Sequence, residues 1–143
     1  MIQKLQNKLF KKYPKIFRQK DLSCKETAMC WGIEFGDGWY QLIDWLCGFI
    51  QWYVDNNKIE QIEAIQIKEK FGGLRFYTNY CDKSINGAIS LAEYMSYLIC
   101  ENCGITQNVS TNEHGYIQSL CKKCREKNKN KERETWKKYE KEE

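Results

Sequence analysis

Two closely spaced cysteine pairs constrain this chain more than any other feature. Cys100 and Cys103 form one CxxC pair, seventeen residues follow, and Cys121 and Cys124 form the second pair. A CxxC turn directs two sulfurs at one metal ion, and two such turns complete a tetrahedral set of four thiolates. The separation lies in the range of zinc ribbons, and Gly104 suits the tight turn after the first pair. The spacing therefore predicts a zinc ribbon at this place in the chain.

The predicted ligand of this ribbon is one structural Zn²⁺ ion. Four thiolates fill the coordination sphere and leave no position for water or substrate, as is typical of structural zinc. An iron–sulfur cluster and two separate redox pairs remain as alternatives, although no βαβ pattern of the thioredoxin type surrounds either pair. The only histidine, His114, lies between the pairs. We expect it to be a solvated turn residue, because four thiolates already saturate the ion.

Four further cysteines follow no standard ligand spacing. Cys24, Cys30, Cys47 and Cys81 are separated by five, sixteen and thirty-three residues. Cys47 falls beside the apolar stripe of an expected helix, which favours a core thiol. We expect buried thiols at these positions, and a second metal site that uses Cys24 and Cys30 is the alternative.

The expected compartment follows from two apolar patterns. Residues 1–12 mix lysine with leucine and phenylalanine and lack the continuous apolar run of a signal peptide. The longest apolar stretch, 39–54, is interrupted by polar residues and is too polar to span a bilayer. We therefore expect a cytoplasmic protein without membrane association, in which thiols stay reduced and paired cysteines indicate a metal.

Apolar periodicity predicts helices in the first part of the chain. Residues 1–13 carry an amphipathic pattern that ends before Pro14, and Ser23 with Glu26 resembles a capping box that begins a short helix. An apolar stripe predicts a helix over 38–56, with Asp37 as its N-cap.

The middle of the chain predicts a β-hairpin followed by a helix. Residues 61–70 alternate, with a slip in register at Ala64, and 74–78 is rich in strand-forming residues. A Phe-Gly-Gly turn separates the two segments. An apolar stripe then predicts a helix over 84–99, capped by Asp82 or Ser84.

These elements predict an α+β fold in three parts. Helices pack on a small antiparallel sheet in a core domain at 1–99, the zinc ribbon occupies 100–124, and a charged helical tail occupies 125–143. The tail is nearly balanced in charge, which favours a solvated helix. Trp136 and Tyr139 would form its docking face.

The residue content does not favour an enzyme. One histidine and a closed metal site leave little for general acid–base chemistry at neutral pH, and no phosphate-binding loop, serine elbow or zinc-protease motif is present. Glu34 and Asp37 are close in sequence, but Asp37 already serves as the expected cap. We expect no catalytic residues.

A nucleic-acid-binding surface is the alternative to a protein-binding one. The net charge of +4 is only mildly basic. Basic residues do occur beside aromatic residues in the hairpin and next to the second cysteine pair, so that bases could stack there. The residues of this alternative are Lys68, Lys70, Arg75, Lys122, Lys123 and Arg125.

Three segments together resemble a family of small zinc-ribbon proteins of bacteriophages and prophages. The segments are 29–40, which contains GDGW, 66–77, which contains KEKFGGLRFY, and the Cys100–Cys124 module. The likeness covers roughly residues 14–124. The family carries a further cysteine where this chain has Phe35, which argues against a second metal site. The resemblance implies a mobile-element origin, a bacterial cytoplasm and no particular activity.

The resemblance and the residue content together lead to an expected function. Small phage accessory proteins often bind and block a host protein, including CRISPR effectors. We expect a protein-binding inhibitor of a bacterial protein with anti-defence, anti-CRISPR-like action, in which exposed aromatic side chains anchor the interface. A homodimer remains an open alternative for its assembly.

Overall fold

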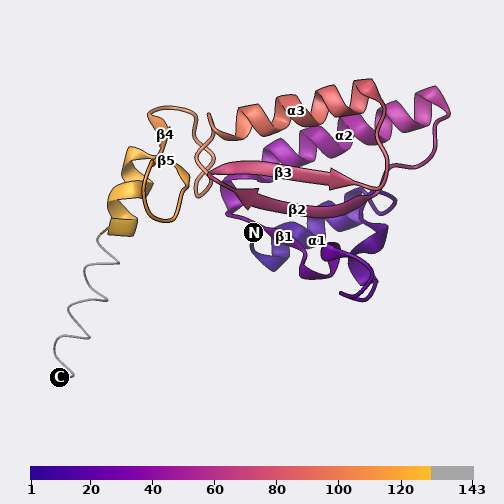
Figure 1. Cartoon of the computed structure of the whole chain (residues 1–143), viewed down its shortest axis with the longest axis horizontal. Coiled ribbons are helices and arrows are strands. Elements are labelled where there is room, and N and C mark those ends of the chain that lie inside the picture. Colours follow the sequence, from indigo (N-terminus) through magenta and orange to yellow (C-terminus); the bar gives the residue numbers. More distant parts are fainter. Residues whose placement is uncertain (130–143) are drawn as a thin grey trace.

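A computed structural model describes residues 1–129 of the chain. Figure 1 shows helices packed on a small sheet, with residues 100–129 in a separate lobe. We name it the metal-binding lobe after its four predicted ligand cysteines. The elements in chain order are α1 (Gln3–Lys12), η1 (Arg18–Asp21), η2 (Ala28–Trp31), β1 (Ile33–Glu34), η3 (Asp37–Trp39), α2 (Tyr40–Asn57), β2 (Ala64–Lys70), β3 (Gly73–Thr78), α3 (Lys83–Ser96), β4 (Val109–Thr111) and β5 (Ser119–Cys121). A further helix starts directly after β5 and is described over 122–129. The predicted α+β class is confirmed.

The β2–β3 hairpin forms the centre of the larger sheet. Its two-residue turn places Phe71 and Gly72 at φ values of 52° and 79°, the left-handed conformation that two-residue hairpin turns require. The register shifts between Ala64 and Gln66, where the sequence pattern slips. The predicted hairpin is confirmed, and its turn points toward the metal-binding lobe (Figure 1).

The sheet is mixed, so the prediction of an antiparallel sheet is wrong. β1 pairs with β2 in parallel, with Ile33 opposite Ile67 and Glu34 opposite Lys68. The strand order is β1-β2-β3, and β4 and β5 form a second, antiparallel sheet of two strands. β1 has only two residues, so the sequence holds no alternating pattern that could predict this strand.

Two long helices lie beside each other along one side of the hairpin, while α1 lies toward the other side (Figure 1). α2 buries Leu42, Leu46 and Ile50 from the predicted stripe. α3 buries Ile85 and Ile89, and its N-cap carboxylate, on Asp82, accepts the backbone N–H of Ile85. The two predicted helices and this predicted cap are confirmed. Their apolar sides join the main core of the molecule.

Two predicted helix starts are wrong. Asp37 does not cap α2; its carboxylate accepts the backbone N–H of Ile2 at 2.8 Å, at the start of α1. No helix begins at Ser23, although the carboxylate of Glu26 does accept the Ser23 N–H at 3.2 Å, as in a capping box. The segment continues as a turn, and a disulfide connects Cys24 to Cys30.

The charged tail lies mostly outside the described residues. Residues 122–129 are helical, as the tail prediction requires. Trp136 and Tyr139, the expected docking face, lie outside the described part. Within residues 1–129, no helix is both long and apolar enough to cross a membrane.

Candidate functional site

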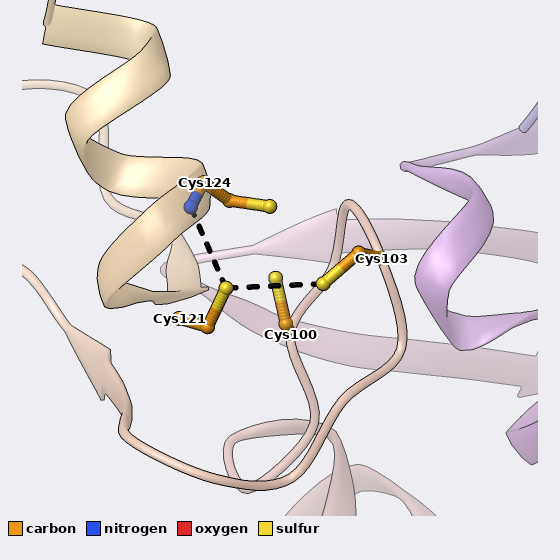
Figure 2. Close-up of side chains that lie close together, drawn as sticks. All are labelled: Cys100, Cys103, Cys121 and Cys124. Atoms are coloured by element: carbon orange, nitrogen blue, oxygen red, sulfur yellow. Dashed lines mark hydrogen bonds between the residues drawn. The ribbon is translucent and has the colours of Figure 1, made fainter.

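The four predicted ligand cysteines meet at one point. Their sulfur atoms all lie within 4.8 Å of one another, and Cys103 Sγ is 3.8 Å from Cys121 Sγ (Figure 2). A tetrahedral ion with metal–sulfur bonds of about 2.3 Å has sulfur–sulfur edges of about 3.8 Å, whereas a disulfide requires about 2.05 Å. The cluster therefore fits a tetrahedral metal ion and not a pair of disulfides. It is the only group of three or more potential ligand side chains within residues 1–129.

The first pair lies in a tight turn after α3. The backbone N–H of Gly104 donates to the carbonyl of Cys100, and the N–H of Cys100 donates to the carbonyl of Ile105, both at 2.8 Å. Gly104 has a φ of 80°, the left-handed region in which glycine is unstrained. These bonds close the turn around both sulfurs, as the glycine after the pair predicts.

The second pair joins a strand to a helix. Cys121 is the last residue of β5, and Cys124 lies in the first turn of the helix that follows. The backbone N–H of Cys124 donates to Cys121 Sγ at 3.5 Å (Figure 2). The first turn of a helix has free N–H groups that stabilise a thiolate. The second pair therefore lies at the start of a helix. A ribbon built from two equal turns would place it in a second hairpin turn instead.

The thiols differ in how readily they lose a proton. Burial would raise the pKa of Cys100, but backbone N–H groups directed at its sulfur lower this pKa to about 7. Burial and the neighbouring thiols raise the pKa of Cys124 to about 12. Four adjacent thiols cannot all ionise without a cation among them, so metal binding at this cluster must release protons.

Two glycines of the GDGW segment hold the first cysteine turn against the core. A Cβ on Gly38 would lie 2.0 Å from the carbonyl oxygen of Cys100, and one on Gly36 would lie 2.4 Å from that of Glu101. The Gly38 N–H donates to the Glu101 carbonyl at 2.7 Å. Trp39 is fully buried, and its indole N–H donates to the carbonyl of Ile99 at 2.9 Å. Only glycine permits this close backbone approach.

The hairpin turn holds the second half of the lobe. Ser119 Oγ donates to the carbonyl of Gly72 at 2.7 Å. A Cβ on Gly72 would lie 2.7 Å from Thr111 Cγ2, so this glycine is also fixed by a close approach. Tyr116 adds a hydrogen bond from its hydroxyl to the carboxylate of Glu69 at 3.1 Å. The GDGW segment and the hairpin turn therefore both contact the metal-binding lobe.

A buried carboxylate lies inside the first cysteine turn. Glu101 is only 4% exposed, and its Oε1 accepts the backbone N–H of Gly36 at 3.1 Å. Its Oε2 has no hydrogen-bond partner within the described residues 1–129. Burial raises the pKa of Glu101, and the negative charge of Glu69 adds to this. The sequence does not predict the contact between Glu101 and Gly36, because the two residues are sixty-five positions apart in the chain.

The remaining cysteines differ from one another. Cys24 and Cys30 form a disulfide with a Cα–Cα distance of 5.2 Å, which overturns both the expected buried thiols and the alternative of a metal site there. Cys47 is buried, as predicted, whereas Cys81 is exposed, so the expectation of a buried thiol is wrong for Cys81. His114 is exposed and outside the sulfur cluster, in agreement with the expected turn residue.

Three of the six predicted nucleic-acid-binding residues lie on the hairpin. Lys68 and Arg75 face each other across β2 and β3, and Lys70 lies 5.5 Å from the ring centre of Phe71. The Arg75 guanidinium donates to Tyr97 Oη at 3.4 Å. These residues therefore share one part of the surface.

The other three lie on the helix after β5. Lys122 and Lys123 are exposed. Arg125 instead donates to Ser110 Oγ at 2.9 Å and to the carbonyl of Leu120 at 3.2 Å, so it fastens the helix to the small sheet. Its guanidinium has a structural use within the lobe.

Glu34 and Asp37, the two acidic residues close in sequence, have different surroundings. Glu34 is exposed on β1, and Asp37 is bound to the backbone at Ile2.

Within residues 1–129, the exposed tryptophan side chains lie on two different surfaces. Trp31, at the end of η2, is 68% exposed and borders a polar hollow of about 370 Å³. Trp45 and Trp52 are 60% and 57% exposed on α2, beside an apolar groove of about 510 Å³.

No protein-family model, curated protein or solved structure matches this chain.

Proposed function

We propose that this protein is a zinc-stabilised, non-catalytic binding protein that inhibits a bacterial protein. The observation that carries the binding role is Trp31, a largely exposed indole held in a rigid and mostly polar surrounding. The metal is assigned a structural role, because four thiolates leave no open coordination position. The bacterial target and the phage origin come from the family resemblance, and a defence effector of the CRISPR type is the first target to test.

Zinc is the metal that the sulfur cluster favours. Thiolate ligands select zinc or iron–sulfur clusters over hard cations, and a single site with sulfur–sulfur distances near 3.8 Å suits one tetrahedral ion. Metal analysis of the purified chain should give one zinc per chain and negligible iron. Cys103→Ser should lower the zinc content, while Cys81→Ser, outside the cluster, should leave it unchanged. Iron with visible absorption would replace this assignment by an iron–sulfur cluster.

Trp31 is displayed on a rigid base. Thr27 caps η2 by accepting the N–H of Met29 at 3.2 Å, and Met29 is fully buried. The backbone N–H of Gly32 donates to the carbonyl of Met29 at 2.9 Å and closes the turn that carries Trp31. A fixed side chain loses little conformational entropy on binding, so an exposed tryptophan on such a base favours an interface anchor.

The surface around Trp31 has the mixed character of a non-obligate interface. The hollow beside it is lined by Gln3, Gln6, Asn7, Lys20 and Asp21 together with Phe10. Interfaces of proteins that exist both free and bound combine aromatic anchors with a polar rim. An inhibitor that must stay dissolved until it meets its target fits this description.

The experiment is a capture followed by reconstitution. Tagged protein is incubated with bacterial lysate with and without nuclease, and the retained protein is identified, purified and assayed for activity against increasing inhibitor. Trp31→Ala should weaken inhibition at least tenfold, because hot-spot truncations cost about 2 kcal/mol or more. Tyr80→Ala, an exposed aromatic elsewhere, is the matched control. Equal inhibition by both variants would remove Trp31 from the interface, and no inhibition by the parent chain would overturn the function.

Nucleic-acid binding is the second candidate function. The favouring observation is the pair Lys68 and Arg75, which place like charges opposite each other on neighbouring strands at an energetic cost. A phosphate between them would relieve this repulsion. Glu34 on β1 lies opposite Lys68 on the other side of β2. Binding to DNA or RNA should fall steeply with salt and weaken in Lys68→Ala but not in Lys8→Ala on α1. An absence of binding at low salt would remove this candidate.

A further inference from the structure

The outer side of α2 and α3 forms an apolar surface of unusual extent, which we call the α2/α3 face. Six side chains define it, and their exposed fractions are 60% for Trp45, 38% for Phe49, 57% for Trp52, 59% for Leu91, 64% for Tyr94 and 50% for Leu98. On α2 they recur at spacings of four and three residues, so they lie on one side of that helix. On α3, Leu91 and Tyr94 are three residues apart, and Leu98 follows just after the end of the helix. The rings of Phe49 and Trp52 are 5.9 Å apart.

A groove of about 510 Å³ runs between the two helices on this face. The α3 wall carries the small residues Ser84, Gly87 and Ala88, and the α2 wall carries Trp45 and Phe49. A Cβ on Gly87 would meet no atom within 4 Å, so the hollow is open at that point. The same face therefore offers both projecting aromatic side chains and a hollow that could receive them.

The area of the face suits a stable protein interface. Since a buried aromatic side chain contributes about 150–250 Å², the exposed fractions of the four aromatic residues add up to roughly 440 Å², and Leu91 and Leu98 add to this area. A standard interface buries about 800 Å² on each partner, and the largest apolar patch of a typical monomer is about 300–600 Å². The face therefore supplies most of one side of a standard interface before any polar rim is counted.

The charge pattern identifies the partner. The chain carries a net charge of +4, yet among residues 1–129 no charged side chain lines the groove. When two identical surfaces meet, every charge on one lies near a like charge on the other, which costs energy unless the surface is uncharged. Homodimer interfaces are also more apolar than those of transient complexes. The α2/α3 face meets both conditions, whereas the polar surface around Trp31 meets neither.

We propose that two copies of this chain form a two-fold symmetric dimer through their α2/α3 faces. In such an isologous interface the projecting Trp45 of each copy can enter the groove beside Gly87 of the other. The two helices of one copy then pack face to face on the two helices of the other, and the four helices share an apolar interior. The Trp31 surfaces lie outside this interface and stay available in both copies.

The test is the mass of the full chain in solution. Sedimentation equilibrium with reductant should give twice the 17.1 kDa chain mass at micromolar concentrations. Leu91→Glu should shift the protein to the monomer, because each copy would bury an unpaired carboxylate. Tyr80→Glu introduces the same charge outside the face and should leave the dimer intact. Far-ultraviolet circular dichroism and zinc content should match the parent in both variants.

A second variant keeps the test decisive if Leu91→Glu fails to fold. Gly87→Leu fills the groove from a position whose Cβ points into open space, so it leaves the monomer intact and should weaken the dimer at least tenfold. A parent chain that is monomeric throughout the concentration range would overturn the proposal. A dimer that disappears with reductant would do so too, because exposed Cys81 would then be the link.

Discussion

Gly38 shows at the scale of one residue how the core is joined to the metal-binding lobe. Its missing side chain lets two backbone segments meet at 2.7 Å between the Gly38 nitrogen and the Glu101 oxygen. A fixed contact of this kind orients the first cysteine turn without touching a sulfur. The glycine is therefore a positioning residue for the metal centre.

Gly38→Ala is expected to lower stability and metal retention together. Its Cβ would lie 2.0 Å from the Cys100 oxygen, so backbone must move, at a cost on the order of 3 kcal/mol. Urea unfolding and the rate of zinc transfer to a competing chelator measure the two effects. Gly87→Ala is the matched control, because its Cβ enters open space within a helix, and it should retain zinc like the parent. Equal zinc transfer from both variants would contradict the positioning role.

Glu63 provides a pH-dependent contribution to the free energy of unfolding, and this contribution does not involve the cysteines. The Arg18 guanidinium bonds its carboxylate at 2.6 and 2.9 Å and holds the pKa of Glu63 below its usual value, and Gln19 adds to the effect. The folded-state pKa is therefore lower than the unfolded one, which is about 4.3. The stabilisation is fully present above that pH and is lost as the pH falls through the folded pKa.

Glu63→Gln should consequently destabilise the protein at neutral pH only. Since the Arg18 side chain is 64% exposed, the expected loss is about 1 kcal/mol. The difference between the parent and the variant, measured by urea unfolding, should shrink toward zero as the pH falls below about 4. Comparing the two proteins at each pH cancels acid-induced metal loss, which both share. A difference that stays constant with pH would contradict the ion pair.

At the scale of elements, the metal-binding lobe has little core of its own. Its buried apolar cluster consists of Cys100, Leu120 and Cys121, with Val109 and Cys124 packed against them. Three of these are predicted metal ligands, so we expect the lobe to depend on the ion. The main core, by contrast, draws on α1, α2, α3 and the hairpin.

Zinc removal should therefore unfold one part of the chain. Metal binding contributes on the order of 10 kcal/mol to such a segment, more than its few apolar contacts can replace. After chelation, hydrogen exchange should show lost protection over 100–129, while β2, β3 and α2 remain protected. Restoring zinc should restore the protection. Global unfolding on chelation would show that the core needs the lobe, and full protection would contradict the role of the metal.

The sequence predicts the long elements well and the short ones poorly. α2 and α3 carry apolar stripes long enough to identify a helix, and the hairpin combines alternation with a glycine turn. β1 has two residues and exists only because β2 offers it a partner. The Ser23 turn has a capping pattern, but tertiary contacts decide its conformation. Local patterns fail where long-range pairing determines the structure.

For the whole molecule, the sequence predicts the metal ligands but not what surrounds them. Ligand spacing is a local property, so the four cysteines can be identified from their positions alone. The contacts of Gly38 with Cys100 and of Gly72 with Ser119 join segments that lie far apart in the sequence. The GDGW and FGG strings are distinctive, but the sequence alone does not show that both segments contact the metal-binding lobe.

The redox state of the Cys24–Cys30 pair tests the compartment of the whole protein. Disulfides are rare in a reducing cytoplasm, so a cytoplasmic location predicts two free thiols there in the cell. Rapid acid quenching, alkylation and peptide mass analysis measure the state of both cysteines. The loop between them is short, so reduction should cost only about 2 kcal/mol and leave the fold intact. Full oxidation in the cell would contradict the cytoplasmic location.

The order of the metal ligands has a consequence for the nascent chain. Cys100 and Cys103 leave the ribosome before Cys121 and Cys124, so the ion can be fully enclosed only after nearly all of the described chain has been made. Until then, Gly36–Trp39 and the hairpin turn have no lobe to contact. The main core can form first, and metal capture is then the last step of folding. With zinc as the proposed ion, we expect this last step of maturation to depend on the zinc supply of the cell.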